Sequence, residues 1–253
     1  MTIDLVIAYY REDLNWLNEL NHINFRKIYI YNKGNNLILN INRNFIEIKL
    51  NNIGKCDHTY LYHIIENYND LGDVIIFTTG GLHNNRYEMF HRILYYTLNT
   101  YNSVFYDHGW SQNVKNDLYN FTINNYFSSD PNNKEELDIL VPSKIRPFGL
   151  WYEKHFPDII INRVNYGGIF SVSCNHIHHR SLENYKILIN EFLNYNNLEV
   201  SHYFERAWIA IFHPIPNDCI YPYNNKQKQI LLFNPKLYEL YKPYWKNIYY
   251  QIN

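Results

Sequence analysis

Near its start the chain reads Ile3-Asp4-Leu5-Val6-Ile7-Ala8-Tyr9, a nearly continuous apolar run. A run of this kind is typical of a strand that is buried on both faces of a parallel sheet. Further strands are predicted at 27–31, at 45–50 and, again as a buried run, at 73–78, and turn residues such as Asn32-Lys33-Gly34 separate them. The alternation of strand and helix patterns predicts an α/β fold with a mixed, mostly parallel sheet flanked by helices.

Helical patterns lie between and after these strands. In one of them Leu61, Ile64, Ile65 and Tyr68 share a face, and Asp57 is in position to cap the helix. Further helices are predicted at 12–21, 84–98, 181–193 (with Ser181 as a cap) and 203–212, and short strands at 104–107 and 168–173. Residues 109–148 read as loops around short strands. We therefore predict one domain over 1–213 and a Tyr- and Pro-rich extension over 214–253, packed on that domain and helical around 236–250.

Composition excludes several classes of protein. The 253 residues include 23 Lys and Arg against 24 Asp and Glu, which gives a formal net charge of -1. This balance argues against a protein that binds nucleic acid through bulk positive charge. No stretch reaches the ~18–20 apolar residues of a membrane helix, and the N-terminus lacks the positive charge of a signal peptide. Cys56, Cys174 and Cys219 are odd in number and far apart, so we expect reduced thiols and a cytoplasmic protein.

Polar residues follow each of the first four predicted strands, where ligands bind in open α/β sheets. The strand ends read Tyr9-Tyr10-Arg11-Glu12-Asp13, Tyr31-Asn32-Lys33-Gly34, Asn52-Ile53-Gly54-Lys55-Cys56-Asp57-His58-Thr59 and Thr78-Thr79-Gly80-Gly81. They offer hydrogen-bonding groups for a base and a ribose, and Arg11, Lys33 and Lys55 for phosphate. These residues have two interpretations, a nucleotide site or ordinary turns, because strand ends carry turn residues in any case. Neither G-x-G-x-x-G nor G-x-x-x-x-G-K-[ST] occurs, so a standard dinucleotide or P-loop site is not expected.

Glu205 and Arg206 interrupt an apolar helical pattern beside Trp208. A carboxylate in such a place is either half of an ion pair with a distant arginine or a functional group that acts as a general base. Tyr166-Gly167-Gly168 opens a predicted strand, where glycine allows a ligand or another backbone to approach closely. The spacing of Cys174, His176, His178 and His179 does not converge on one ion, so no metal site is predicted there.

Several segments carry a family resemblance: 6–17, 30–34, 52–68, 73–80, 166–173 and Phe204-Glu205-Arg206-Ala207-Trp208. Together they resemble a family of uncharacterised glycosyltransferase-like proteins of fungi, bacteria and giant DNA viruses, over roughly residues 4–212. The last two are also similar to the acceptor half of GT-A glycosyltransferases, where a glycine-containing strand and a Glu-Arg-aromatic helix line the acceptor side. The resemblance implies a GT-A-like (Rossmann-like) fold. It also implies sugar transfer from a nucleotide-sugar, with a UDP-sugar favoured, to a glycan or protein acceptor.

The chain departs from the GT-A pattern after the fourth strand. GT-A enzymes usually carry an Asp-x-Asp there, which holds Mg²⁺ or Mn²⁺ on the diphosphate, but this chain reads Thr78-Thr79-Gly80 and has no Asp-x-Asp. Either cationic side chains neutralise the leaving diphosphate, or the enzyme is altered or inactive. The candidate cations are Lys55, Arg86 and Arg206, and Asp57 and Asp107 could still contribute to an unorthodox Mn²⁺ or Mg²⁺ site.

The resemblance leads to a set of expected roles, with no metal cofactor required. The nucleoside would be held by Tyr9, Arg11, Asn32 and Lys33, the ribose or donor sugar by Asp57, His58 and Thr59, and the diphosphate by Thr78, Thr79 and Gly80. Glu205 would take the proton of the acceptor hydroxyl, with Arg206 beside it, in an inverting transfer. The acceptor would contact Trp110, Tyr166, Gly167 and Gly168.

Two other functions stay open. One is a non-catalytic nucleotide- or carbohydrate-binding protein of the same fold, and the other is a virion or scaffold protein that assembles through its many tyrosines. The chain would act in the cytoplasm (the host cytoplasm if viral), without membrane or nucleic-acid partners, and the Tyr-rich tail allows a homodimer.

Overall fold

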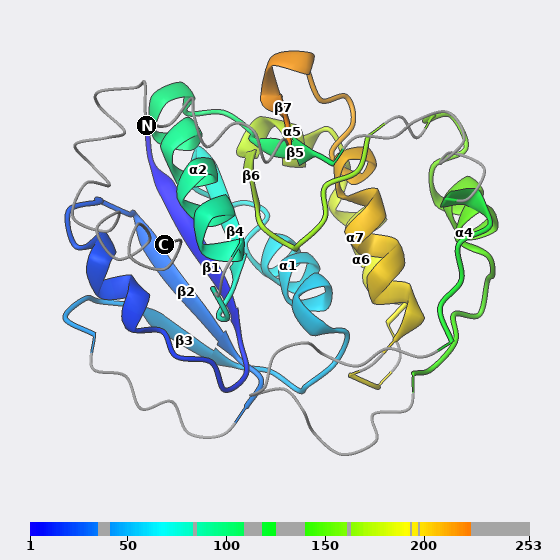
Figure 1. The fold of residues 1–253 in the computed structure, drawn as a ribbon, viewed down its shortest axis with the longest axis horizontal. Helices are drawn as coiled ribbons and strands as arrows, with labels where there is room; N and C mark the ends of the chain where they lie inside the picture. Colours follow the sequence, from blue (N-terminus) through cyan, green and yellow to red (C-terminus); the bar gives the residue numbers. More distant parts are fainter. Residues whose placement is uncertain are drawn as a thin grey trace, which may run out of the picture. The chain divides into compact units, whose positions relative to one another are not determined.

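A five-stranded sheet in the order β3-β2-β1-β4-β6 forms the centre of the computed structural model (Figure 1). The structure describes residues 1–34, 41–82, 85–108, 118–124, 140–160, 163–192, 194–196 and 198–223. The strands are β1 (Ile3–Tyr9), β2 (Lys27–Asn32), β3 (Ile46–Lys49), β4 (Val74–Thr79) and β6 (Phe170–Ser173). The first four are parallel and β6 is antiparallel to β4, which confirms the predicted mixed, mostly parallel sheet.

β1 lies in the middle of the sheet, and all seven of its residues are buried. Val6 pairs with Tyr29 of β2 on one side and with Phe77 of β4 on the other. The single charge in the strand, Asp4, forms a two-pronged pair with Arg26, with an Nε–Oδ1 distance of 2.8 Å. Asp4 also accepts a hydrogen bond from the Gly72 N–H at 2.8 Å. These bonds satisfy a buried carboxylate and join the segments that precede β2 and β4 to β1.

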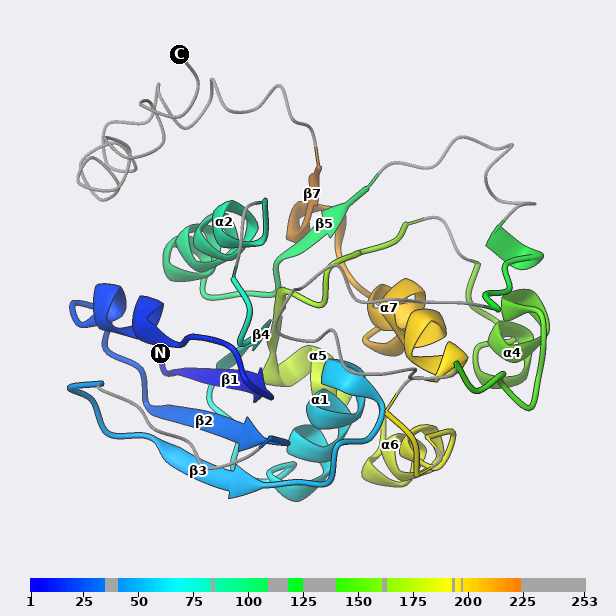
Figure 2. The same ribbon diagram turned by 60° about the horizontal axis from the view of Figure 1, so that its bottom comes forward.

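Helices cover the sheet on two sides. Figure 2 shows α2 (Asn85–Thr100) on one side of β1 and β4, and α1 (Lys55–Glu66) on the other. Next to α1 lie α6 (Leu182–Ile189) and α7 (Glu199–Ile211), and α4 (Phe148–His155) packs on α7. A 3₁₀ helix, η1 (Asn15–Leu20), connects β1 to β2.

The strand order reverses between β1 and β4. The chain runs outward from β1 to β2 and β3, and then crosses back to place β4 on the other side of β1. In open α/β sheets such a switch point leaves a crevice at the carboxyl ends of the two strands, and ligands bind there. The topology therefore points to the ends of β1 and β4 as the first place to look for a site.

The start of α1 requires glycine. Gly54 and Lys55 both have left-handed backbone, with φ of 54° and 49°. A Cβ on Gly54 would lie 2.2 Å from a ring carbon of Phe192, so no side chain fits there without displacing that ring. Gly54 is the N-cap residue, and no side chain caps the helix. The expectation that Asp57 caps this helix is therefore wrong, because its carboxylate turns into the protein instead.

The second half contains elements that the sequence patterns missed. α4 and the five-residue α5 (Cys174–His178) lie in segments that were not predicted to be helical. β5 (Phe105–Asp107) and β7 (Ile220–Pro222) form a separate two-stranded sheet. The cap of α6 is confirmed, since the Ser181 hydroxyl accepts a hydrogen bond from the Asn184 N–H. α7 begins four residues before the predicted start at 203, at the fully buried Glu199.

The chain divides into two compact units, Met1–Tyr221 and Pro222–Asn253. The helix expected around 236–250 lies outside the described residues. All three cysteines are free, as expected. Within the described part of the chain, no helix is long and apolar enough to cross a membrane.

Candidate active site

Glu12 lies at the switch point and holds the turn that follows β1. Its Oε2 accepts hydrogen bonds from the backbone N–H groups of Tyr10, at 2.7 Å, and Arg11, at 3.1 Å. A Cβ on Gly80 would lie 3.0 Å from the same oxygen, so the end of β4 passes close to this carboxylate. The indole N–H of Trp16 donates to the Gly80 carbonyl at 3.0 Å and also holds the end of β4. From the sequence, Glu12 was only one residue of a turn and had no expected role.

The residues expected beneath a diphosphate lie at the end of β4. Thr78 is fully buried, and its hydroxyl donates to the Thr79 carbonyl at 3.2 Å. Thr79 is half-buried, and its hydroxyl donates to the Gly81 carbonyl at 3.4 Å. Of Thr78, Thr79 and Gly80, only Thr79 is partly exposed, so it is the one whose side chain a ligand can reach.

Tyr9 is the last residue of β1 and is 9 % exposed, and Arg11 lies in the turn that follows. Burial, and then the negative charge of Glu12, raise the pKa of the Tyr9 hydroxyl. Arg11 is exposed, and its guanidinium lies 4.8 Å from the centre of the Tyr10 ring. This arrangement puts an aromatic surface and a positive charge beside the end of β1.

The side chain of Asn32, also expected at the nucleoside, is bonded within the protein. It is fully buried, its amide donates to Glu47 at 2.7 Å, and its oxygen accepts the Gly34 N–H at 2.9 Å. These bonds hold the turn that follows β2.

Lys33 is also buried, and its ammonium donates to the backbone carbonyls of Ile53 and Lys55. Burial lowers the pKa of Lys33 to about 7, and the negative charge of nearby Asp57 opposes that change. The Lys33 ammonium therefore fastens the loop that leads into α1.

Asp57, in the first turn of α1, is 4 % exposed. Its Oδ1 accepts a hydrogen bond from the indole N–H of Trp208 at 2.8 Å, and the Cys56 sulfur lies 3.8 Å from Oδ2. Burial, and then the negative charge of Glu205, raise the pKa of Asp57 to about 7, while the Trp208 bond acts in the opposite direction. Asp57 therefore gains or loses a proton near neutral pH and responds to the charge of Glu205.

Glu205, in the middle of α7, keeps 28 % of its side chain exposed. Its Oε1 accepts a hydrogen bond from the Gly167 N–H at 2.9 Å, and its Oε2 lies 3.8 Å from Nη1 of Arg206. The arginine that faces this carboxylate is thus its neighbour in sequence and not a distant one. The backbone N–H fixes the direction of the carboxylate and leaves part of it open to solvent.

Gly168 lies where three segments meet. Its backbone is left-handed, with φ of 66°, and that of Gly167 has φ of 93°. A Cβ on Gly168 would lie 3.0 Å from the Cys56 sulfur and 3.8 Å from the Thr79 methyl group. Tyr60 also donates its hydroxyl to the Gly168 carbonyl at 2.6 Å. The turn before β6, the start of α1 and the end of β4 are therefore brought together, as glycine at these positions suggested.

Arg206 and Tyr166 form a stack beside Glu205. The guanidinium of Arg206 lies 3.6 Å from the centre of the Phe121 ring and 5.2 Å from that of Tyr166. Its Nη1 donates to the His202 carbonyl at 2.7 Å. Burial lowers the pKa of Arg206, although a guanidinium still stays charged at neutral pH.

His108 is a residue near the site that the sequence reasoning missed. It comes directly after β5, and its Nδ1 accepts the Tyr166 N–H at 3.2 Å. Burial lowers its pKa, and the negative charge of Glu205 acts in the opposite direction. The strand at 104–107 was predicted, so an inspection of its carboxyl end, like that of the first four strands, would have found His108.

Lys55 and Arg86 bring positive charge to the same region. Burial raises the pKa of Asp57, and the charge of Lys55 opposes that shift. In the same way, Arg86 opposes the burial that raises the pKa of Cys56. Arg86 is exposed in the first turn of α2. Both cations are therefore close enough to the start of α1 to change its electrostatics.

Three more residues were expected at the site, namely His58, Thr59 and Trp110. The His58 ring packs against Phe192 at 5.6 Å between centres, and burial lowers its pKa to about 4. Thr59 is fully buried, with its hydroxyl 3.4 Å from the Lys55 carbonyl. Trp110 lies outside the described residues.

The described residues do not fit the divalent ion that the GT-A resemblance implies. Among the described residues, no group of three or more His, Cys, Asp and Glu side chains is arranged to hold a metal ion. At the end of β4 two threonines and a glycine replace the Asp-x-Asp pattern. Asp57 is bonded to Trp208, and Asp107 lies 3.7 Å from Arg163. Neither aspartate considered for an ion is therefore part of a ligand set.

Comparison with other proteins places the chain in a family. No curated protein and no solved structure matches it. One family profile matches residues 5–227, a span that includes β1, β4, α1, α7 and every site residue described above. Since this match covers most of the chain, the chain belongs to the family described as "Protein of unknown function (DUF3431)".

Proposed function

We propose that this protein is a GT-A-like glycosyltransferase whose donor, a nucleotide-sugar, binds at the carboxyl ends of β1 and β4. The observation that carries the proposal is the contact between Glu205 and Gly167, in which a backbone N–H holds a partly exposed carboxylate beside the turn before β6. Gly168, the next residue, lies against Cys56 and near Thr79, which connects that carboxylate to the crevice. The order β3-β2-β1-β4 with an antiparallel fifth strand supports a Rossmann-like nucleotide site at the switch point.

Glu205 is the proposed general base. An acceptor hydroxyl beside the carboxylate would give its proton to Glu205 as its oxygen attacks the anomeric carbon of the donor. The bond from that carbon to the diphosphate would break, and the nucleoside diphosphate would leave with the electron pair. Base catalysis of this kind contributes ~10²–10⁴-fold to a rate. The Gly167 N–H supports this role because it fixes one carboxylate oxygen and leaves the other to face the acceptor.

Positive charge near the start of α1 would stabilise the departing diphosphate. The twelve-residue α1 has its positive end there, and Arg86 and Lys55 act electrostatically on its first turn. Charge that develops in the transition state is stabilised most by groups already held in place. We assign the direct contact to Arg86, which is exposed. The Arg206 guanidinium is stacked on Phe121 and bonded to a carbonyl, and the Nζ of Lys55 is buried, so Lys55 would act through its charge alone.

We propose fewer contacts to the nucleoside than the sequence suggested. Tyr9 and Arg11 lie at the end of β1 and just after it, and we keep them as contacts for the base and ribose. Asn32 and Lys33 are assigned to the turns that shape the site, since their polar groups are bonded to Glu47, Gly34, Ile53 and Lys55. Four further parts of this proposal follow from the family resemblance. They are a UDP-sugar as donor, a glycan or protein as acceptor, a cytoplasmic location and no required metal.

A second candidate is a protein of the same fold that binds a nucleotide or a carbohydrate without catalysis. The observation in its favour is that polar side chains after the strand ends already have hydrogen-bond partners within the protein. Asp57 accepts a hydrogen bond from Trp208, and Lys33 donates to two backbone carbonyls. The two candidates differ in one measurable respect, namely whether a bound donor is consumed.

The test incubates the full chain with UDP-, GDP- and CMP-sugars, with EDTA or with Mn²⁺, and measures nucleotide release and thermal unfolding together. We expect one donor class to be consumed in EDTA, and we expect Glu205→Gln to lower the rate by about 100-fold or more while UDP still raises the melting temperature. Glu183→Gln is the matched control, because Glu183 is 74 % exposed on α6. A rise in melting temperature without consumption of the donor would favour the binding protein. Full activity in Glu205→Gln would remove the assignment of Glu205 as the base. No response to any donor would contradict both candidates.

A further inference from the structure

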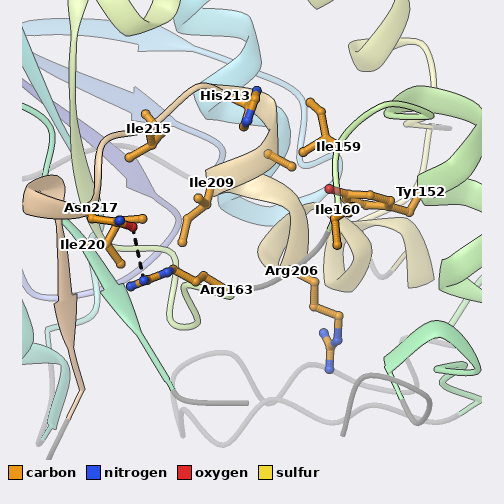
Figure 3. A pocket seen from close by; sticks show the side chains of 11 residues that line it. Tyr152, Ile159, Ile160, Arg163, Arg206, Ile209, His213, Ile215, Asn217 and Ile220 are labelled. Atoms are coloured by element: carbon orange, nitrogen blue, oxygen red, sulfur yellow. Dashed lines mark hydrogen bonds between the residues drawn. The ribbon is translucent and has the colours of Figure 1, made fainter. Parts of the chain in front are cut away.

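A pocket lies along α7 and is lined by residues other than those at the strand ends (Figure 3). Arg206, Ile209 and Ala210 of α7 form one wall, and the other walls come from the chain after α4 and from the loop that leads into β7. The volume of the pocket is about 120 Å³, several times the ~10–15 Å³ that one water requires. The pocket therefore has room for one small ring.

The pocket combines buried apolar side chains with an exposed polar rim. Ile209 and Ile220 are 9 % and 8 % exposed, whereas His213 and Asn217 are exposed and Ile160 is 75 % exposed. A ligand in such an open pocket keeps part of its surface in water and places another part on the isoleucines. A hexose in its ring form suits both surroundings, because its ring carbons carry C–H groups and its periphery carries hydroxyls.

One polar group of the pocket has no partner. Tyr152, on α4, is 1 % exposed, and its hydroxyl makes no hydrogen bond within the described part of the chain. Figure 3 shows this hydroxyl pointing into the pocket. A buried hydroxyl without a partner costs stability, so an oxygen that a ligand brings to it is favourable.

The two arginines of the pocket favour a neutral ligand. The Arg163 guanidinium donates to the Asn217 oxygen at 3.2 Å, the dashed line in Figure 3, and lies 3.7 Å from the Asp107 carboxylate. The Arg206 guanidinium lies 3.8 Å from the Glu205 carboxylate. Each of these positive charges is therefore already balanced by a carboxylate. A guanidinium has five N–H groups and an amide has two, so Arg163 and Asn217 keep donors for the hydroxyls of a ligand.

Glu205 lies next to this pocket on α7. It precedes Ile209 by four residues, and residues with this spacing are neighbours on one side of a helix. A ring that contacts Ile209 can therefore direct one hydroxyl toward the Glu205 carboxylate and a different one toward Tyr152. The oxygen that loses its proton is then not the oxygen bonded to Tyr152, which requires a ligand with several hydroxyls.

We propose that this pocket holds one neutral hexose ring of the acceptor, so that the acceptor is a glycan and not a side chain of a protein. The inference deepens the proposed function, on which it rests, because it names the class of acceptor. A serine or threonine side chain brings a single oxygen, which cannot give its proton to Glu205 and also supply Tyr152 and Asn217.

The binding test uses the methyl glycosides of glucose, galactose and mannose, which are neutral. Methyl glucuronide, which carries a carboxylate in place of the CH₂OH group of methyl glucoside, is the charged counterpart. The full chain is titrated without and with UDP and followed by backbone amide shifts in nuclear magnetic resonance. We expect at least one neutral glycoside to bind and to shift the amides of Ala210 and Asn217, and methyl glucuronide to bind no more tightly than methyl glucoside.

Tyr152→Phe removes only the hydroxyl. It should weaken the bound glycoside about fivefold, the factor for one hydrogen bond of about 1 kcal/mol. It should not lower the free energy of unfolding of the free protein, because the hydroxyl has no partner there. Tyr195→Phe is the matched control, since Tyr195 is 56 % exposed, and it should change neither quantity.

A second variant fills the pocket. Ala210→Phe places a ring where the hexose would lie and should abolish measurable binding. Ile187→Phe, at a residue of α6 that is 56 % exposed, is its control and should leave binding unchanged. Thermal unfolding shows whether each variant folds, and the amide shifts of the wild type together with Tyr152→Phe decide the matter if Ala210→Phe does not.

No binding of any neutral glycoside, or binding that either Tyr152→Phe or a folded Ala210→Phe leaves unchanged, overturns the inference. Tighter binding of methyl glucuronide than of methyl glucoside would also overturn it, because the pocket would then select an acidic sugar. Consumption of a nucleotide-sugar reports the proposed function separately. Consumption without glycoside binding would therefore remove only this class of acceptor.

Discussion

The replacement of Asp57 by asparagine should change how stability depends on pH. Asparagine keeps an oxygen that can accept the Trp208 N–H, so the buried contact at 2.8 Å is retained while the titrating group is lost. Asp57 has an ordinary pKa of 3.8 when unfolded and about 7 when folded. Since the folded value is the higher, the contribution of Asp57 to stability is fully present below the unfolded value and is lost as the pH rises toward about 7.

The size of the effect follows from the two pKa values. Each pH unit between them costs the folded protein about 1.4 kcal/mol, so the wild type should lose about 3 kcal/mol between about pH 5 and about pH 8 through this group. Asp57→Asn should therefore gain about 3 kcal/mol relative to the wild type over the same interval. Urea unfolding followed by tryptophan fluorescence at several pH values measures this difference.

Two further variants make the reasoning specific. Asp70→Asn is the control, because Arg26 and Lys27 hold the pKa of the exposed Asp70 carboxylate at about 2, below the whole interval. Glu205→Gln removes the negative neighbour of Asp57 and should reduce the slope of the wild-type curve. A stability difference between Asp57→Asn and the wild type that stays constant from about pH 5 to about pH 8 would refute the placement of a protonated, buried Asp57.

Other consequences arise from close contacts elsewhere in the fold. Gly34→Ala should abolish folded protein, because its Cβ would lie 1.7 Å from the Tyr10 carbonyl oxygen; circular dichroism of a normally folded variant would contradict this contact. Glu199→Ala should lower the free energy of unfolding by about 3–5 kcal/mol, since the buried carboxylate accepts the N–H groups of Ile123 and Ser143 and pairs with Arg146. Urea unfolding measures it, exposed Glu183→Ala is the control, and equal losses in both variants would argue against a special role for Glu199. Gly54→Ala should also be destabilising and should be partly restored by Phe192→Leu, whose smaller side chain relieves the contact at 2.2 Å; melting temperatures without any such recovery would count against that packing.

The strands were predictable because their signals are local. Buried parallel strands are continuous apolar runs, and those at 3–9 and 73–78 end at turn residues that mark the carboxyl edge. The short helices were not predictable in this way. α5 has five residues, too few to show a helical period, and α4 begins after Pro147 with a glycine in its first turn.

The candidate site was predictable only in part. Glu205, Gly167 and Gly168 stood out because a carboxylate in an apolar helix and paired glycines are locally unusual, and the structure brings them together. The partner of Asp57 could not be read from the sequence, since Trp208 is 151 residues away. The partners of Lys33 could not be read from the sequence for the same reason, since the two carbonyls that it binds come 20 and 22 residues later in the chain.

The most direct test of the central claim is a crystal structure of the full chain with UDP bound. The account predicts that UDP lies across the carboxyl ends of β1 and β4, with its diphosphate beside Arg86 and the first turn of α1 and its terminal phosphate facing Glu205. UDP bound elsewhere, or a crevice filled by the side chains of the protein itself while UDP stays in solution, would contradict it.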